Sequence, residues 1–425
     1  MSDFQLGEEF ALAMDEGDAL RKFRERFLFP KTANGNDCVY LCGHSLGLQP
    51  TAAAAYVEEE LSDWARLAVE AHFRAKHPWM PYHRLLTEQT SELVGAQPAE
   101  VVVMNSLTVN LHLMMVSFYR PTRARHKIVV ERGAFPSDQY AVKSQILFHG
   151  FDPATSLIEL TPRAGESCIR QEDIEELIDR NADEMALILL GGVNYATGQA
   201  FDMERITQAG RKRGCVVGFD LAHAAGNLQL KLHEWGPDFA VWCSYKYLNG
   251  GPGCTAGCFV HERHAQAWDR PRFAGWWGHD ERTRFEMPPD FRPMPGAEGW
   301  QLSNPPILSL AALRASMQIF HEAGMPRLRT KSILLTSYLE FLLKDIRSNN
   351  FSIVTPAAPE RRGAQLSIRI PHNGRLLCER LTRDGIIGDW REPDTFRVAP
   401  TPLYNSYHDV FQFVGKFRSA LENPL

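Results

Sequence analysis

The middle of the chain contains three short apolar runs, MALILLGGVNY (185–195), GCVVGFD (214–220) and FAVWCSYKY (239–247). Each run is rich in β-branched or aromatic residues and is apolar on both faces. Between the first two lies FDMERITQAGRKRG (201–214), which has apolar residues at helical spacing and ends on glycine. Such runs separated by helices indicate a mainly parallel sheet covered on both sides, an α/β fold. Ligands bind to such sheets at the carboxyl ends of the strands.

The same pattern extends outward in both directions. KIVVERGAF (127–135) and CTAGCFVHE (254–262) are predicted to be further strands. From about Pro305 the pattern changes to two long helical stretches, short strands and a final helix, which predicts a smaller α+β domain. The predicted units are an N-terminal segment packing with the small domain (1–60), a large domain (61–304) and the small C-terminal domain (305–425).

Composition narrows the class of protein. The 425 residues are 44% hydrophobic and 23% charged, with a formal net charge of -5, as in ordinary globular proteins. The densest basic run, RARHK (123–127), is short, so we expect no nucleic-acid partner. The N-terminal sequence lacks a signal-peptide pattern, and no apolar run approaches the ~20 residues of a membrane span. The eight cysteines form no zinc-ligand pattern. We therefore expect a cytoplasmic protein with reduced thiols, no metal and no membrane contact.

A lysine stands at the end of the third run, in SYKYLNGGPG (244–253). Poor solvation at a strand end disfavours the charged form of Lys246, which makes its amine a usable nucleophile for an aldehyde cofactor. The glycines that follow allow the backbone to approach a bound group closely. A lysine that merely extends to solvent before an ordinary turn is an equally good interpretation of this motif alone.

A carboxylate ends the preceding run, in GFDLAHAAGN (218–227). Asp220 is expected to lie beside Lys246 across one strand spacing, where it could pair with a pyridinium nitrogen and keep it protonated. His223 follows within reach of the same site. The alternative role for Asp220 is a helix N-cap, although Asp220 and Lys246 at the ends of successive strands are harder to dismiss together.

Two further segments matter: one follows the apolar run VVVM (101–104) and the other follows the predicted strand that begins at Lys127. NSLTVN (105–110) begins a helix-like stretch, and its hydroxyl and free backbone N–H groups suit a phosphate; a plain N-cap is the alternative. FPSD (135–138) offers an aromatic face that could stack on a planar ring. A core phenylalanine and a turn is the alternative there.

Taken together, six motifs resemble those of the kynureninase family in order and spacing. They are SYKYLNGGPG, FDLAHAAGN, NSLTVNLHL, AFPSD, GWWGH and RVAPTPLYNS, and the resemblance runs from LCGHSLG (41–47) to the final helix. It implies the fold type I of pyridoxal-phosphate enzymes, with a mainly parallel seven-stranded sheet, a pyridoxal 5'-phosphate (PLP) site on the large domain and active sites shared in a homodimer. The implied reaction is hydrolysis of kynurenine or 3-hydroxykynurenine to alanine and the corresponding anthranilate, in tryptophan catabolism and NAD biosynthesis.

The resemblance also implies roles for individual residues. Lys246 would hold the cofactor as a Schiff base and move protons, Asp220 would pair with the ring nitrogen with His223 close by, and Tyr245 would relay protons. Phe135 would cover the ring, with Pro136, Ser137 and Asp138 lining the pocket. The groups that bind the cofactor phosphate would come from Leu107, Thr108 and Tyr245. Trp276 and Asn304 of the neighbouring subunit would reach the same phosphate. Arg397 would bind the substrate carboxylate, which suits its bidentate geometry. At the position of Gly191, some family members instead carry a serine that contacts the phosphate.

Three residues bear on substrate preference. In kynureninases that favour the 3-hydroxylated substrate, residues resembling His72, Ser303 and Asn304 line the aromatic end of the pocket. Donors and acceptors placed for a ring hydroxyl are left unpaired when that hydroxyl is absent. The sequence therefore predicts a preference for 3-hydroxykynurenine, with an ordinary helix-face histidine as the alternative for His72.

Two rival functions stay open at this point. One is another enzyme of the same fold, a cysteine desulfurase or a small-amino-acid aminotransferase. A desulfurase needs an exposed reactive cysteine, whereas the cysteines here lie mostly in apolar segments. The other is a binding or regulatory protein with this fold, against which the Lys246 and Asp220 pair argues.

Overall fold

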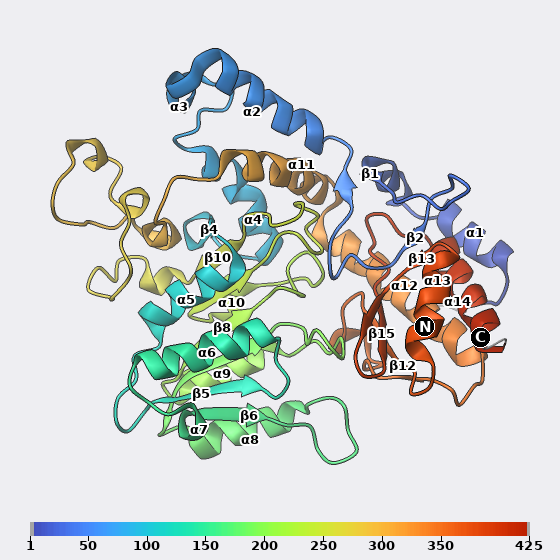
Figure 1. The fold of residues 1–425 in the computed structure, drawn as a ribbon. Coiled ribbons are helices and arrows are strands. Elements are labelled where there is room, and N and C mark those ends of the chain that lie inside the picture. The colour runs from blue at the N-terminus through green and yellow to red at the C-terminus, as the bar shows by residue number, and fades with distance from the viewer. Residues whose placement is uncertain (1–3, 423–425) are drawn as a thin grey trace.

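The computed structural model describes residues 4–422 and contains a large α/β body beside a smaller α+β body (Figure 1). The large body is built on a seven-stranded sheet in the order β4-β10-β9-β8-β7-β5-β6. Only β10 runs antiparallel to its neighbours, so the prediction of a mainly parallel sheet is confirmed. The strands are β4 (Val101–Val103), β5 (Lys127–Glu131), β6 (Leu157–Leu160), β7 (Met185–Gly191), β8 (Val216–Asp220), β9 (Phe239–Trp242) and β10 (Gly257–Val260).

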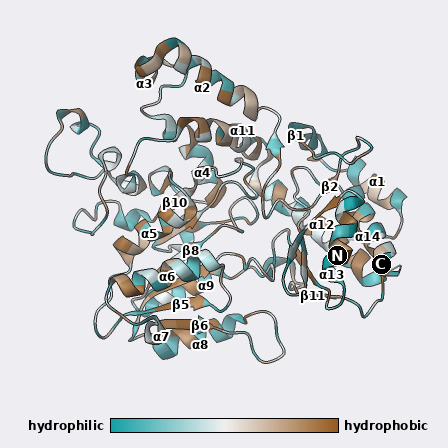
Figure 2. Cartoon of the chain, in the orientation of Figure 1, coloured by the Kyte–Doolittle hydropathy of each residue, from teal (hydrophilic) through white to brown (hydrophobic). Residues whose placement is uncertain are grey.

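Helices cover both faces of this sheet, as the two-faced apolar strands require. In β5, Val129 packs into one core cluster while Ile128 and Val130 pack into another, because successive side chains of a strand point to opposite faces. Figure 2 shows the strands as mostly hydrophobic. Helices α5 (Leu107–Phe118) and α6 (Pro136–Phe148) contribute to the second cluster. Those contributing to the first are α4 (Thr87–Val94), α8 (Gln171–Asn181), α9 (Met203–Lys212), α10 (Leu232–Trp235), α11 (Ile307–Ala323) and the start of α12 (Met325–Asp345).

The smaller body has its own antiparallel sheet and core. The sheet order is β11-β12-β15-β14, and a separate apolar cluster lies between it and the neighbouring helices. Ala11 of the N-terminal helix joins this cluster, and β2 (Val39–Tyr40) pairs with β13 (Ile386–Ile387). The predicted domain boundaries stay a prediction. The elements are α1 (Glu8–Glu16), α12 (Met325–Asp345), α13 (Gly374–Arg383), α14 (Tyr407–Glu422), β11 (Ser352–Ile353), β12 (Leu366–Arg369), β14 (Asp389–Arg391) and β15 (Thr395–Val398).

The remaining helices and strands lie around these two bodies. Helix α2 (Ala53–Leu67) packs along α11 at one edge of the large body (Figure 1). The others are α3 (Ala71–Arg74), α7 (Pro153–Ser156), β1 (Phe27–Leu28) and β3 (Gln49–Pro50). Among residues 4–422, no helix combines the length and the apolarity needed to cross a bilayer.

Candidate active site

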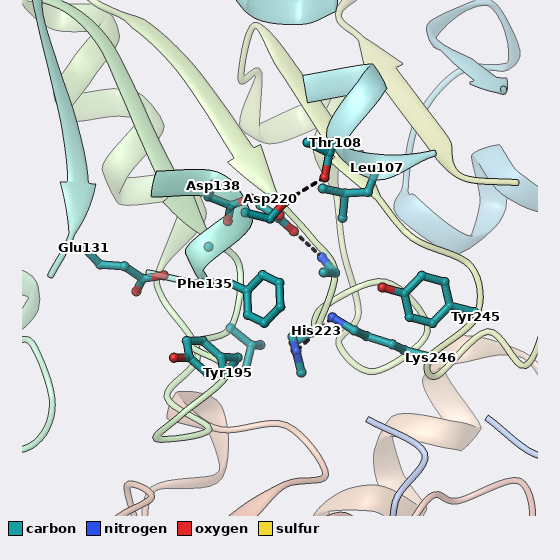
Figure 3. Close-up of a pocket in the computed structure, with 14 residues that line it drawn as sticks. Leu107, Thr108, Glu131, Phe135, Asp138, Tyr195, Asp220, His223, Tyr245 and Lys246 are labelled. Atoms are coloured by element: carbon teal, nitrogen blue, oxygen red, sulfur yellow. Dashed lines mark hydrogen bonds between the residues drawn. The ribbon is translucent and has the colours of Figure 1, made fainter. Parts of the chain in front are cut away.

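A pocket opens at the carboxyl ends of β5, β7, β8 and β9, where the sheet topology predicts a ligand site (Figure 3). Most of the cofactor-site residues predicted from the sequence meet there. The pocket is lined by Leu107, Thr108, Glu131, Phe135, Ser137, Asp138, Gly191, Val193, Tyr195, Asp220, Ala222, His223, Tyr245 and Lys246.

Lys246 enters the pocket from the turn that follows β9. Its Nζ lies 3.1 Å from Nε2 of His223 and 5.7 Å from the ring centre of Phe135. Burial, reinforced by the charge of Lys246, lowers the pKa of His223 well below its usual range, so the imidazole is neutral and can accept from the amine. The turn is closely packed: a Cβ on Gly47 would meet the carbonyl oxygen of Lys246 at 2.4 Å, which only glycine avoids.

Two carboxyl groups face each other deeper in the pocket. Asp220 ends β8 and is 8% exposed, and its Oδ1 accepts from the N–H of Ala222 at 2.7 Å. Burial raises the pKa of Asp220. Burial and the neighbouring Asp220 raise the pKa of Asp138 further, so Asp138 is the carboxyl group that holds a proton when the two compete. A cationic ring nitrogen placed here would favour the charged form of Asp220.

The start of α5 forms another wall. Thr108 Oγ1 lies 2.8 Å from Ser137 Oγ, and Ser106 makes no side-chain cap to the helix. The plain N-cap interpretation therefore lacks its hydrogen bond, and the first N–H groups of α5 have no capping side chain at the pocket. Hydroxyl and N–H groups at a helix N-terminus are suited to bind phosphate.

The β5–α6 turn carries the aromatic wall. Phe135 is 43% exposed, so it is no core residue, and its ring meets Tyr195 edge-on at 5.4 Å. Pro136 is the first residue of α6 and is not among the lining residues, although it fixes the turn. Tyr245 faces Phe135 across the pocket (Figure 3), and burial raises its pKa, so the phenol remains protonated at neutral pH.

Four residues line the pocket without having been predicted from the sequence: Glu131, Val193, Tyr195 and Ala222. Glu131 did carry a signal, since a carboxylate ends the otherwise apolar strand KIVVE. Ala222 lies between Asp220 and His223 in a motif already singled out, although its own side chain carries no chemical signal. Val193 and Tyr195 belong to a loop that tertiary contacts bring to the pocket.

Besides Pro136, five predicted residues lie outside this pocket. Ser303 and Asn304 are exposed and His72 is partly exposed; Trp276 is 40% exposed and its Nε1 donates to the carbonyl of Arg284. Arg397, in contrast, is 1% exposed. It donates to the carbonyl of Tyr195 at 2.7 Å and pairs with Asp389.

Solved structures share this architecture. An apo cysteine desulfurase from Thermococcus onnurineus NA1 superposes with a TM-score of 0.74 at 15% identity, covering 99% of this chain and 100% of that one. The Escherichia coli cysteine desulfurase CsdA gives 0.76 at 17% identity, covering 95% and 98%. A C-DES variant gives 0.76 at 15% identity, covering 93% and 98%, and carries glycine linked to its PLP cofactor. The fold and the lysine pocket define the class: fold type I pyridoxal-phosphate enzymes.

Sequence relatives identify the family within that class. The chain is 67% identical to a kynureninase of Koribacter versatilis over 98% of this chain and 99% of that one, and 60% identical to one of Myxococcus xanthus over 97% and 96%. Residues 328–417 match the model of the kynureninase C-terminal domain. The chain belongs to the kynureninase family, as the motifs predicted. It is a hydrolase of carbon–carbon bonds in ketonic substances with pyridoxal 5'-phosphate as its cofactor.

Proposed function

We propose that the protein hydrolyses L-kynurenine and 3-hydroxy-L-kynurenine to L-alanine and the corresponding anthranilate, at the pocket around Lys246. One observation carries this proposal. Lys246 and Asp220 follow or end the neighbouring strands β9 and β8, and both line one pocket with Phe135. A nucleophilic amine, an anionic partner for a ring nitrogen and an aromatic face are the groups that PLP chemistry requires.

The pocket residues fit the cofactor in their donors and acceptors. Within residues 4–422, His223 Nδ1 and Asp138 Oδ1 are buried without a hydrogen-bond partner. Buried polar atoms normally have a partner, so these two are suited to bind a polar ligand. Lys246 would hold the cofactor aldehyde, Asp220 its ring nitrogen and Phe135 its face. Leu107 and Thr108 would bind the phosphate. When bound, the cofactor supplies an electron sink next to the bond that breaks.

The chain's own groups then handle protons and orientation. Lys246 Nζ, freed when substrate binds, would move protons at the substrate α-carbon, with neutral His223 3.1 Å away to orient the amine. The Tyr245 phenol stays protonated and would relay protons beside Lys246. Arg397, held by the carbonyl of Tyr195, would bind the substrate carboxylate.

We further propose a preference for 3-hydroxykynurenine, with the product 3-hydroxyanthranilate directed toward nicotinamide nucleotides, in the cytoplasm. The preference rests on His72, Ser303 and Asn304. We expect a higher kcat/KM for 3-hydroxykynurenine, measured by anthranilate fluorescence. Exchanging His72→Trp and Asn304→Thr should reduce the ratio of the two kcat/KM values by roughly tenfold, since each unpaired polar group costs about 1–3 kcal/mol.

The outcome separates two claims. Wild-type protein that turns over kynurenine more efficiently would refute the preference and leave the hydrolase assignment intact. A Ser348→Ala variant, altered at a partly exposed position of the small body, is a control in which both kcat/KM values should stay unchanged.

We propose that two chains share each active site in a homodimer. Trp276 and Asn304 lie on the surface rather than in the pocket of their own chain, which supports a role in the partner's site. The segment around Trp276, gold in Figure 1, extends away from the sheet and exposes Trp268, Phe273, Phe285 and Met287. Apolar side chains gathered in this way on a surface commonly mark an interface.

Mixing two inactive variants tests the shared site. Lys246→Ala chains mixed with Trp276→Ala chains should recover roughly one quarter of wild-type activity. Half of randomly paired dimers are mixed, and each mixed dimer keeps one complete site of two. Sedimentation should give a dimer, and an active monomer would refute the proposal.

A further inference from the structure

One loop connects the pocket to the smaller body. It spans residues 193–200, closed at its base by a bridge between Val193 and Ala200. Val193 and Tyr195 line the pocket, and the Tyr195 ring packs against Phe135. The conformation of this loop therefore affects both the shape of the pocket and the position of the residues of the smaller body that bind to the loop.

On that other side, the loop holds Arg397. The Tyr195 carbonyl accepts from Arg397 at 2.7 Å and from Gln365 Nε2 at 2.9 Å. The next two carbonyls also accept from the smaller body, from Ser367 Oγ at 2.7 Å and from Thr355 Oγ1 at 2.6 Å. A shift of the loop would therefore carry the Arg397 guanidinium with it.

On the pocket side, the loop is tied to Glu131 through one side chain. Asn194 Nδ2 donates to Glu131 Oε2 at 3.1 Å, while Asn194 Oδ1 accepts from the N–H groups of Ala196 and Thr197 at 3.0 and 2.9 Å. Asn194 thus closes the turn and links it to the strand end of β5. The backbone of Gly191 borders the same carboxylate and acts to lower the pKa of Glu131.

Gly191 gives the Glu131 carboxyl group its space. A Cβ on Gly191 would lie 2.8 Å from Glu131 Oε1, closer than real Cβ contacts come. The residue at which this chain departs from serine-bearing family members is thus the one that lets the carboxylate approach the loop. Glu131 lies opposite Lys246 and Tyr245 in the pocket (Figure 3).

We propose that Glu131 is a positioning residue for substrate recognition: its carboxylate anchors the 193–200 loop through Asn194 and so fixes Arg397 where the substrate carboxylate binds. The inference rests on the proposed role of Arg397. Glu131 contacts neither the reacting atoms nor the substrate in this account.

The anchor depends on pH. The groups facing Glu131 are Asp220 and Asp138, with Lys246 and His223 across the pocket. Burial, with a smaller contribution from Asp220, raises the pKa of Glu131 to about 7. A raised carboxyl pKa means that Glu131 is charged above pH 7 and accepts the hydrogen bond from Asn194 well, whereas below pH 7 it is protonated and accepts more weakly. Substrate affinity is therefore expected to fall as the pH drops through about 7.

Glu131→Gln tests this role with almost no change of shape. The amide carries no charge and has one acceptor oxygen in place of two, so it accepts the anchoring hydrogen bond from Asn194 more weakly than the carboxylate does. We expect KM for kynurenine to rise about tenfold while kcat changes less than about threefold. The dissociation constant of L-alanine, followed by cofactor absorbance, should rise by a similar factor. Both values should lose their dependence on pH near 7.

Two further variants complete the test. Asn194→Asp keeps the turn but removes the donor to Glu131, so it should reproduce the effect. Glu159→Gln, the same exchange at an exposed position of the neighbouring β6, should leave KM unchanged. Melting temperature and cofactor absorbance report on folding, and the pH dependence of L-alanine binding to wild-type protein needs no variant.

The outcomes separate this inference from the proposed function. Wild-type protein that releases no anthranilate would refute the proposed function. Active wild-type protein whose L-alanine affinity is the same at pH 6 and pH 8 would overturn the role of Glu131. Unchanged KM in both Glu131→Gln and Asn194→Asp would overturn it equally.

Discussion

Lys246→Ala is expected to lose turnover of kynurenine by more than about 10⁴-fold, because no other pocket residue offers an amine to the cofactor or to the substrate α-carbon. The neighbouring His223 cannot substitute, since its lowered pKa leaves a neutral imidazole without the required nucleophilic amine. Turnover is measured by the fluorescence of released anthranilate, with the variant protein supplied with excess PLP.

Two comparisons make this prediction specific. Lys246→Arg keeps a cation in the pocket but cannot form the covalent link, so it should be as inactive as Lys246→Ala. Lys143→Ala, on the exposed face of α6, should retain wild-type activity. Borohydride reduction and peptide mapping should find the cofactor on Lys246, and label on a different lysine would overturn the assignment of the site.

Asp220→Asn is expected to lower kcat by about 10²–10³-fold with the cofactor still bound. The amide has nearly the same shape as the carboxylate but carries no charge, so it cannot keep a ring nitrogen protonated. Stopped-flow absorbance would report cofactor binding, and product fluorescence would report kcat. The hydrogen bond to the N–H of Ala222 can be kept by the amide oxygen, so the local turn should survive.

A capping aspartate elsewhere serves as the control. Asp202 caps α9 by accepting from the N–H of Arg205, and Asp202→Asn should leave kcat unchanged. If Asp220→Asn behaved like Asp202→Asn, Asp220 would be a structural cap and the electron-sink argument would lose its anionic partner.

The main sheet and the centre of the pocket were predictable because their signals are local. Five apolar runs gave five strands, and the polar residues at their ends meet in one pocket. Strands β4 and β6 were not predicted as strands. Strand β4 has only three residues, and in the LIEL of β6 only Leu160 is fully buried, so its apolar character is weak.

Other parts of the site depend on contacts between distant segments. Tyr195 reaches the pocket because Gln365, Ser367 and Arg397 hold its loop from the smaller body. Hydrogen bonds across some 170–200 residues leave no periodicity in the sequence. His72, Trp276 and Asn304 were assigned by resemblance alone, and a single chain leaves them at the surface, so their roles stay predictions.

The most direct test of the central claim is product stoichiometry. Purified protein supplied with PLP and L-kynurenine should release anthranilate and L-alanine in equal amounts, because one bond is broken and both fragments leave. Transamination products in place of this pair, or sulfide release from cysteine without cleavage of kynurenine, would contradict the account.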